Sequence, residues 1–230
     1  MNAPQQLLLD LPLRAALGRD DFLVAPSNAA AVKLVDDWPD WPSYAACLVG
    51  PEGAGKSHLS TVWQVRAAAK LCALADLKVE AVPELLATGA LCLMHDEMRG
   101  FDETALFHTL NFARQHDAKI LLTSRSEPSA WKVQLPDLAS RLKAVPVVHI
   151  APPDDALLRG VLVKLFTDRQ IIIDEALLSY MLARMPRSLA AARRLVSEID
   201  RQAMIQKAEI SRTFVGRVLA DFENPDLFLA

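Results

Sequence analysis

The sequence contains little glycine and little cysteine. Only 8 of the 230 residues are glycine, so any cluster of glycines stands out. The three cysteines are Cys47, Cys72 and Cys92; each lies in an apolar run, and none has the spacing of a metal ligand. These features indicate buried, reduced thiols and a cytoplasmic protein. There is no internal repeat and no low-complexity segment.

Long apolar runs and an excess of basic residues are also missing. No apolar run reaches 18 residues, and the N-terminus lacks the basic region and cleavage pattern of a signal peptide, which argues against secretion and a membrane span. A net charge of −3 disfavours a protein whose whole surface binds nucleic acid. Apolar residues, by contrast, make up 52% of the chain, which suffices for a buried core and excludes a disordered chain.

Short apolar runs alternate with amphipathic stretches from about residue 44 to 150. The runs lack period-two alternation, so we interpret them as strands buried on both faces. The expected strands are 44–49, 71–76, 90–95, 119–124 and 145–150, and the helical patterns between them are 57–70, 80–88 and 103–116. This alternation predicts an α/β fold with a parallel sheet flanked by helices.

No strand pattern follows the segment "APPDD" at 151–155. The remaining helical patterns are 154–168, 174–184, 188–207 and 211–221. The change in pattern predicts an α/β core over 19–151 and a small all-helical lid domain over 152–230, preceded by a terminal peptide and linker over 1–18.

Three of the eight glycines fall in "GPEGAGKS" at 50–57, between an expected strand and an expected helix. The stretch matches G-x-x-x-x-G-K-[ST], a loop in which β-carbons would block the approach of phosphates and backbone N–H groups attract negative charge. Lys56 would contact the β- and γ-phosphates, and Ser57 would ligate Mg²⁺. The residues predicted to bind the nucleotide here are Gly50, Gly53, Gly55, Lys56, Ser57 and His58. An ordinary glycine turn is the alternative.

A second motif, "LCLMHDE" at 91–97, ends an apolar strand in two carboxylates. Asp96 would hold Mg²⁺ through its water shell, and Glu97 would polarise an attacking water. An acidic turn after a strand is the alternative. We interpret His95 as a structural hydrogen-bond partner.

The next strand ends in "LLTSRSEP" at 121–128. Ser124 would contact the terminal phosphate, with Arg125 and Thr123 as alternatives. A serine-rich turn before Pro128 explains the stretch equally well.

Together with "LPDLASRL" at 135–142 and the helical appendage, these motifs resemble AAA+ ATPases of the DnaA type. "DDFLVAPSNAAA" at 20–31 is similar to the segment that packs near adenine in that family, which implies a role for Asn28 in nucleotide binding. "LFHTLNFAR" at 106–114 resembles the helix after the metal-binding strand. The resemblance implies bound ADP or ATP with Mg²⁺.

Two arginines gain roles from the same resemblance. "LPDLASRL" resembles the segment ending in an arginine finger, which implies that Arg141 acts on ATP held by DnaA; a surface arginine at a helix end is the alternative. The lid should carry a second phosphate-sensing arginine. The stretch at 185–203 offers Arg187, Arg193 and Arg194, of which Arg187 is the candidate, although the expected position falls nearer Ala190. A solvated or partner-binding basic face explains Arg187, Arg194 and Arg201 as well.

The N-terminal stretch "QLLLDLPL" at 6–13 resembles the motif that binds the sliding clamp, the β subunit of DNA polymerase III. The glutamine would dock at a polar subsite and the leucines in an apolar pocket. The residues concerned are Gln6, Leu7, Leu9 and Leu11. Packing of this stretch on its own domain is the alternative.

The resemblance as a whole implies a cytoplasmic regulator that inactivates the initiator DnaA by stimulating hydrolysis of its ATP. Contact with DNA would be indirect, through the clamp. The alternatives are a self-contained ATPase, similar to a helicase loader or clamp loader, and an adaptor that binds nucleotide without hydrolysing it. The sequence leaves open whether the chain forms a homodimer, which nucleotide it holds at rest, and what the tail "NPDLFLA" at 224–230 does.

Overall fold

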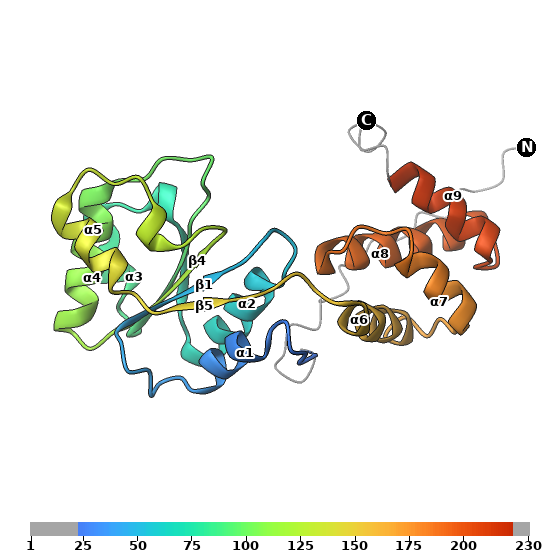
Figure 1. Ribbon diagram of the computed structural model, residues 1–230, viewed down its shortest axis with the longest axis horizontal. Helices are drawn as coiled ribbons and strands as arrows, with labels where there is room; N and C mark the ends of the chain where they lie inside the picture. Colours follow the sequence, from blue (N-terminus) through green and yellow to red (C-terminus); the bar gives the residue numbers. More distant parts are fainter. Residues whose placement is uncertain (1–22, 223–230) are drawn as a thin grey trace, which may run out of the picture.

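The structure is a computed structural model that describes residues 23–222. The predicted clamp-binding residues and the tail lie outside this range. Figure 1 shows an α/β core built around one sheet and a separate group of helices, the lid, joined to it after β5.

The core contains a five-stranded parallel sheet in the order β2-β3-β4-β1-β5. The strands are β1 (Ala45–Val49), β2 (Lys70–Ala73), β3 (Ala90–Met94), β4 (Lys119–Ser124) and β5 (Val147–His149). The predicted parallel sheet is confirmed. β2 ends three residues earlier than expected, because Leu74–Asp76 forms a 3₁₀ turn.

The register of the sheet brings the ends of four strands together. Val49 is opposite both Ser124 and His149, and Met94 is opposite Thr123. Residues that follow β1, β3, β4 and β5 therefore meet at one edge, which is where parallel α/β sheets place their ligand sites.

Helices cover both faces of the sheet. α1 (Ala29–Asp36) and α2 (Lys56–Ala67) pack with Ala46 and Leu48 on one face. On the other face, Cys47 and Val49 pack with α3 (Val82–Leu85), α4 (Glu103–Gln115) and α5 (Pro136–Lys143). Burial on both faces explains why the strands read as continuous apolar runs. Two further 3₁₀ turns are Val79–Ala81 and Pro128–Ala130.

The lid consists of helices with a separate apolar core, as predicted. They are α6 (Asp155–Thr167), α7 (Glu175–Leu182), α8 (Leu189–Gln206) and α9 (Arg212–Phe222). Each of the first three begins at an N-cap side chain that accepts a backbone N–H: Asp154 from Leu157, Asp174 from Leu177, and Ser188 from Ala191. Such caps satisfy N–H groups that have no partner within the helix.

Residues 23–28, which we name the strap, contact both units. Leu23 and Ala25 pack against the apolar core of the lid. Ser27 accepts a hydrogen bond at its carbonyl from the N–H of Ala151, at 3.0 Å, just before the lid begins. Asn28 is buried at the start of α1. The strap therefore connects the core to the lid independently of the β5–α6 linker.

Within residues 23–222, no helix combines the length and the apolar character needed to cross a bilayer.

Candidate nucleotide site

The phosphate loop, residues 50–55, connects β1 to α2. Its backbone takes left-handed conformations at Gly53 (φ +75°) and Gly55 (φ +107°), which other residues rarely adopt. A β-carbon at Gly50 would lie 2.5 Å from the carbonyl oxygen of Ile150 in the neighbouring chain segment. The glycines predicted from the sequence thus permit both the turn and its close approach to the segment that follows β5.

Lys56 is the first residue of α2, and its ammonium group lies across the phosphate loop. Nζ donates to the carbonyl oxygens of Gly50 at 2.5 Å and Pro51 at 2.8 Å. Burial and the nearby charge of Arg125 lower the pKa of Lys56, while the carboxylates of Glu52 and Glu97 act in the opposite direction. A cation therefore lies where phosphates would bind, within electrostatic reach of Glu97.

Asp96 and Glu97 are exposed directly after β3. The Asp96 Oδ1 accepts the N–H of Met98 at 3.0 Å. With the Ser57 hydroxyl at the start of α2, the Asp96 carboxylate offers the oxygen donors that Mg²⁺ prefers. Within residues 23–222 no group of three or more His, Cys, Asp or Glu side chains could hold a metal, so Mg²⁺ here would need further oxygens from phosphate and water.

His95 packs in an aromatic cluster beside these carboxylates. Its ring centroid lies 4.1 Å from that of Trp131 and 5.4 Å from that of Phe101. Burial lowers the pKa of His95. The backbone N–H of His95 donates to the Thr123 carbonyl, which ties the end of β3 to β4. These contacts fit a structural role.

The end of β4 places two polar side chains differently. Ser124 is almost fully buried; its hydroxyl accepts the N–H of Ser126 at 3.3 Å, and its carbonyl accepts the N–H of Gly50. Arg125 is exposed and forms an ion pair with Glu52 of the phosphate loop at 2.8 Å. Of Thr123, Ser124 and Arg125, Arg125 is therefore the residue whose side chain contacts the phosphate loop.

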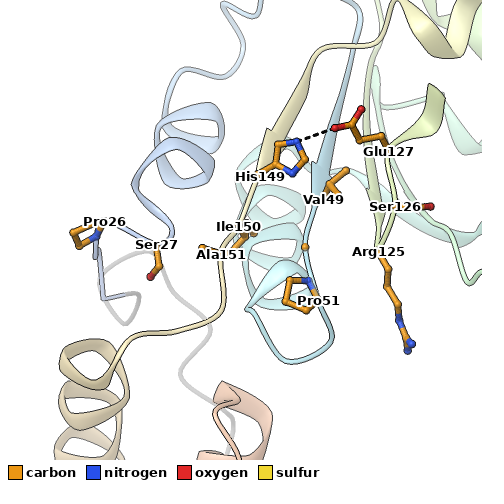
Figure 2. A pocket seen from close by; sticks show the side chains of 11 residues that line it. Pro26, Ser27, Val49, Pro51, Arg125, Ser126, Glu127, His149, Ile150 and Ala151 are labelled. Atoms are coloured by element: carbon orange, nitrogen blue, oxygen red, sulfur yellow. Dashed lines mark hydrogen bonds and ion pairs between the residues drawn. The ribbon is translucent and has the colours of Figure 1, made fainter. Parts of the chain in front are cut away.

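A cleft of about 610 Å³ opens along the ends of β1, β4 and β5. Figure 2 shows its two sides: Pro26 and Ser27 of the strap lie on one side of β5, and Arg125, Ser126 and Glu127 on the other. His149 Nε2 contacts Glu127 Oε1 at 3.1 Å on the charged side. The volume is typical of small-ligand sites, and the cleft is continuous with Gly50 of the phosphate loop.

Asn28, predicted to contact the nucleotide, is 1% exposed. Its Oδ1 accepts the N–H of Ala25 and its Nδ2 donates to the Leu23 carbonyl, each at 2.9 Å. The side chain therefore holds the strap in shape, and the adjacent Pro26 and Ser27 line the cleft.

The start of lid helix α8 lies against the phosphate loop, as Figure 1 shows. The Leu189 N–H donates to the Gly53 carbonyl at 3.0 Å, and a β-carbon at Gly53 would lie 1.9 Å from Ser188 Oγ. One turn further along α8, Arg193 donates to Nδ1 of the buried His58 on α2. We refer to the Gly53–Leu189 and His58–Arg193 pairs as the loop–lid contact.

The side chains of the two predicted arginines are each engaged within their own unit. Arg187 forms an exposed ion pair with Asp155 of the lid at 2.9 Å. Arg141, on α5, has its guanidinium carbon 5.0 Å from the ring centroid of Phe107. Figure 1 places α5 at the end of the core away from the lid. Arg141 thus lies on the side of the core away from the lid, whereas Arg187 directly precedes Ser188, which lies against Gly53 of the phosphate loop.

The structure thus brings most of the predicted nucleotide-site residues to one edge of the sheet: Gly50, Gly53, Gly55, Lys56, Ser57, His58, Asp96, Glu97 and Ser124. Sequence reasoning did not identify the lid partner of His58 or the ion pair between Glu52 and Arg125. A sequence motif could not predict these two contacts, because each joins residues that are far apart in the sequence.

The strand order, the glycine loop between β1 and α2, and the helical lid define a P-loop fold of the AAA+ type. Within that class, domain III of the Thermotoga maritima replication initiation protein DnaA is similar, with a TM-score of 0.72, 20% identity, and coverage of 92% of this chain and 98% of that one. AMPPCP-bound DnaA from Aquifex aeolicus has a TM-score of 0.68 at 17% identity, covering 92% of this chain and 71% of the other.

The fold is shared beyond DnaA. A mutant RuvB from Thermotoga maritima gives a TM-score of 0.66 at 16% identity, with 88% of this chain and 72% of the other covered. No protein-family model and no curated protein matches the sequence. At these identities the similarity establishes the fold, and the function rests on the site.

Proposed function

We propose that the chain is a nucleotide-binding regulator of replication initiation of the Hda type, which stimulates hydrolysis of ATP bound to DnaA. The observation that carries the proposal is a glycine loop between β1 and α2, with left-handed backbone at Gly53 and Gly55, within a fold similar to DnaA domain III over nearly its whole length. AMPPCP-bound DnaA among the similar structures supports an adenine nucleotide, ADP or ATP, as the ligand.

The residues at the phosphate loop account for binding. Backbone N–H groups of the loop and of the α2 N-terminus would hold the phosphates, and Lys56 would exchange its carbonyl partners for phosphate oxygens. Ser57 and Asp96 would hold Mg²⁺, which neutralises phosphate charge when bound. The cleft between the strap and β5 has room for the base and ribose.

Binding is tested by identifying the nucleotide that copurifies with the full chain and by titrating stripped protein with ADP and ATP. We expect Lys56→Ala to abolish measurable binding and Lys33→Ala, an exposed lysine on α1, to leave it unchanged. Equal affinity of both variants would show that the phosphate loop does not bind the ligand.

Arg141 is the proposed arginine finger, acting on ATP held by DnaA rather than on the nucleotide of its own chain. Its position on α5, away from its own phosphate loop, supports an action across a subunit interface. A fixed guanidinium stabilises the charge that develops on the transferred phosphoryl group, which in other systems is worth roughly 10³-fold or more in rate.

The finger is tested by measuring ATP hydrolysis by DnaA in the presence of DNA-loaded sliding clamp. Arg141→Ala should reduce the rate to that of DnaA alone, while Lys143→Ala, two residues further along α5, should stimulate normally. Full stimulation by Arg141→Ala would contradict the assignment.

Tethering to the clamp through Gln6, Leu7, Leu9 and Leu11 completes the proposal, and DNA contact would then be indirect. Alanine at Gln6 and Leu9 should abolish retention of the chain by immobilised clamp without changing nucleotide affinity. Retention equal to that of the unchanged chain would remove the tether from the proposal.

A second candidate is a self-contained ATPase. The observation in its favour is the exposed carboxylate of Glu97 just after β3, whose charge acts on the pKa of Lys56. Steady-state turnover without DnaA or clamp, lost in Glu97→Gln, would favour this function; a chain that only uses nucleotide as a structural ligand would show no turnover.

A further inference from the structure

Arg141 differs from several other arginines of the core in how its guanidinium is held. Arg66, Arg99 and Arg125 each form an ion pair with a carboxylate. Among the residues that the structure describes, no carboxylate pairs with Arg141, and its guanidinium carbon lies over the ring of Phe107, 5.0 Å from the centroid. The face of an aromatic ring attracts a cation without neutralising its charge.

Phe107 belongs to α4, within the stretch "LFHTLNFAR" at 106–114. Its side chain is partly buried and packs against the apolar core on this face of the sheet. The packing restricts the orientations of the ring, and the ring in turn restricts those of the guanidinium. A side chain of the rigid core therefore determines where the cation of α5 lies.

The same helix also holds the start of α5. Glu103, one turn before Phe107, accepts the N–H groups of Gln134 and Leu135 at 2.9 Å and 2.8 Å. Leu135 is the N-cap of α5 and offers no side-chain cap of its own. The carboxylate also lies at the positive end of the helix dipole of α5. α4 thus contacts α5 at its first turn and at the turn that carries the proposed finger.

An arginine finger has two requirements that conflict in most settings. The guanidinium must be ordered before it meets the phosphate, because ordering a long side chain during binding costs free energy. It must also keep its charge uncompensated until then. An ion pair with a carboxylate would meet the first requirement and fail the second. Contact with a ring meets both, since an uncharged ring leaves the N–H groups of the guanidinium free to donate to phosphate.

We propose that Phe107 is the positioning residue of the Arg141 finger: its ring orders the guanidinium without neutralising it. The inference rests on the proposed function, since it requires that Arg141 acts on ATP held by DnaA. Phe107 acts through Arg141 and contacts no reacting atom. Its loss should therefore lower the maximal rate of hydrolysis and leave the affinity of the chain for DnaA unchanged.

The test measures hydrolysis of DnaA-bound ATP against the concentration of the full chain on DNA-loaded clamp. Phe107→Leu keeps an apolar side chain and removes the ring. Its maximal rate should fall roughly three- to fivefold, the range expected for one cation–π contact, while the half-saturating concentration stays the same. Phe107→Tyr keeps a ring and should retain the full rate.

Phe112→Leu is the matched control. Phe112 lies on the same helix, packs against the same apolar core, and has its ring 4.1 Å from that of His116 instead of under an arginine. This variant should stimulate hydrolysis as the unchanged chain does, because its ring holds no finger.

The results separate this inference from the proposed function. Full stimulation by Arg141→Ala would remove the proposed finger itself. If Arg141→Ala is inactive, a normal maximal rate of Phe107→Leu would overturn the role of Phe107. An equal loss in Phe112→Leu, or an equal loss in Phe107→Tyr, would overturn it too.

A second measurement keeps the packing of the ring. Replacing Phe107 by pentafluorophenylalanine nearly preserves its shape but reverses the charge distribution of the ring face, which should then repel the guanidinium. The maximal rate should fall at least threefold, while nucleotide affinity and the midpoint of thermal unfolding stay those of the unchanged chain. A normal maximal rate in this protein would overturn the proposal even if Phe107→Leu does not fold.

Discussion

The core and the lid differ in how they place polar groups at the site. The core collects its groups from strand ends that are far apart in sequence, and the parallel sheet aligns them at one edge. The lid contributes through one helix end, where Leu189 and Arg193 contact the loop and α2. The core side of the site therefore depends on the order of the strands in the sheet. The lid side depends on the contact that the start of α8 makes with the phosphate loop and α2.

The core and the lid also differ in the residues that can serve as spectroscopic or chemical probes. All four tryptophans and all three cysteines belong to the core. The tryptophans are Trp38, Trp41, Trp63 and Trp131. Tryptophan fluorescence and thiol alkylation therefore report on the core alone, whereas circular dichroism at helical wavelengths follows both regions. This contrast makes it possible to ask whether the core and the lid unfold together.

The largest effects are expected from emptying each apolar core in turn. Trp63 is 0% exposed and stacks on Trp41 at 5.3 Å, while Phe166 fills the lid core at 1% exposed. Trp63→Ala and Phe166→Ala should each lower the free energy of unfolding by about 3–5 kcal/mol.

Thermal unfolding followed by tryptophan fluorescence and circular dichroism would show how these losses spread. If docking couples the regions, Phe166→Ala should lower the fluorescence midpoint as well as the circular dichroism midpoint. An unchanged fluorescence midpoint would show that the lid melts independently.

A smaller effect is expected from altering the docking itself. Gly53→Ala combines strain at φ +75° with a clash against Ser188, whereas Gly89→Ala at φ +79° meets open space. The strain common to both should cost roughly 1–2 kcal/mol. The additional loss in Gly53→Ala measures the lid contact, and we expect faster proteolysis within the lid in this variant only. Equal stability and equal proteolysis of the two variants would contradict the docking.

Asn28→Ala should cause the next largest loss in the free energy of unfolding. It leaves the Ala25 N–H and the Leu23 carbonyl without their partner, which should cost about 1–3 kcal/mol. Chemical denaturation measures the loss, and Asn111→Ala, a partly buried position on α4, serves as the control. We expect little change in nucleotide affinity beyond that caused by a looser strap; complete loss of binding in a folded variant would instead indicate direct contact.

The smallest effect concerns the thiols and leaves stability unchanged. Burial raises the pKa of Cys47 and of Cys92 to about 12 in each case. Cys72, on the edge strand β2, is only partly buried, although burial raises its pKa too. Alkylation followed by mass spectrometry should modify Cys72 first, since the thiolate is the reactive form. Faster modification of Cys92 would indicate that the centre of the sheet opens.

The sequence predicted the sheet well for a physical reason. Strands buried on both faces must be apolar throughout, so each appears as a distinct run. The helices α1 and α5 were missed, because each is only eight residues long and spans about two turns, and α5 starts at Pro136. The end of β2 was misplaced because Leu74 remains apolar and buried although it belongs to a turn.

The site was predictable only where a loop needs particular residues at fixed spacing. The phosphate loop meets this condition, because glycine is required at Gly53 and Gly55 by backbone conformation. The contact between Arg193 and His58 does not, since it joins residues 135 positions apart. Asn28 illustrates a different difficulty. The sequence predicted that it contacts the nucleotide, whereas its side chain is hydrogen-bonded to Ala25 and Leu23 of the strap and its neighbours Pro26 and Ser27 line the cleft.

The strap gives the N-terminal end of the chain a mechanical connection that sequence order alone would not suggest. Leu23 and Ala25 pack against the apolar core of the lid, while Asn28 is buried at the start of α1. A pull transmitted along the polypeptide from the residues before Leu23 would therefore reach the lid first and the sheet only afterwards. Tension at that end would therefore act first on the packing between the strap and the lid, before it disturbed the interior of the core or of the lid.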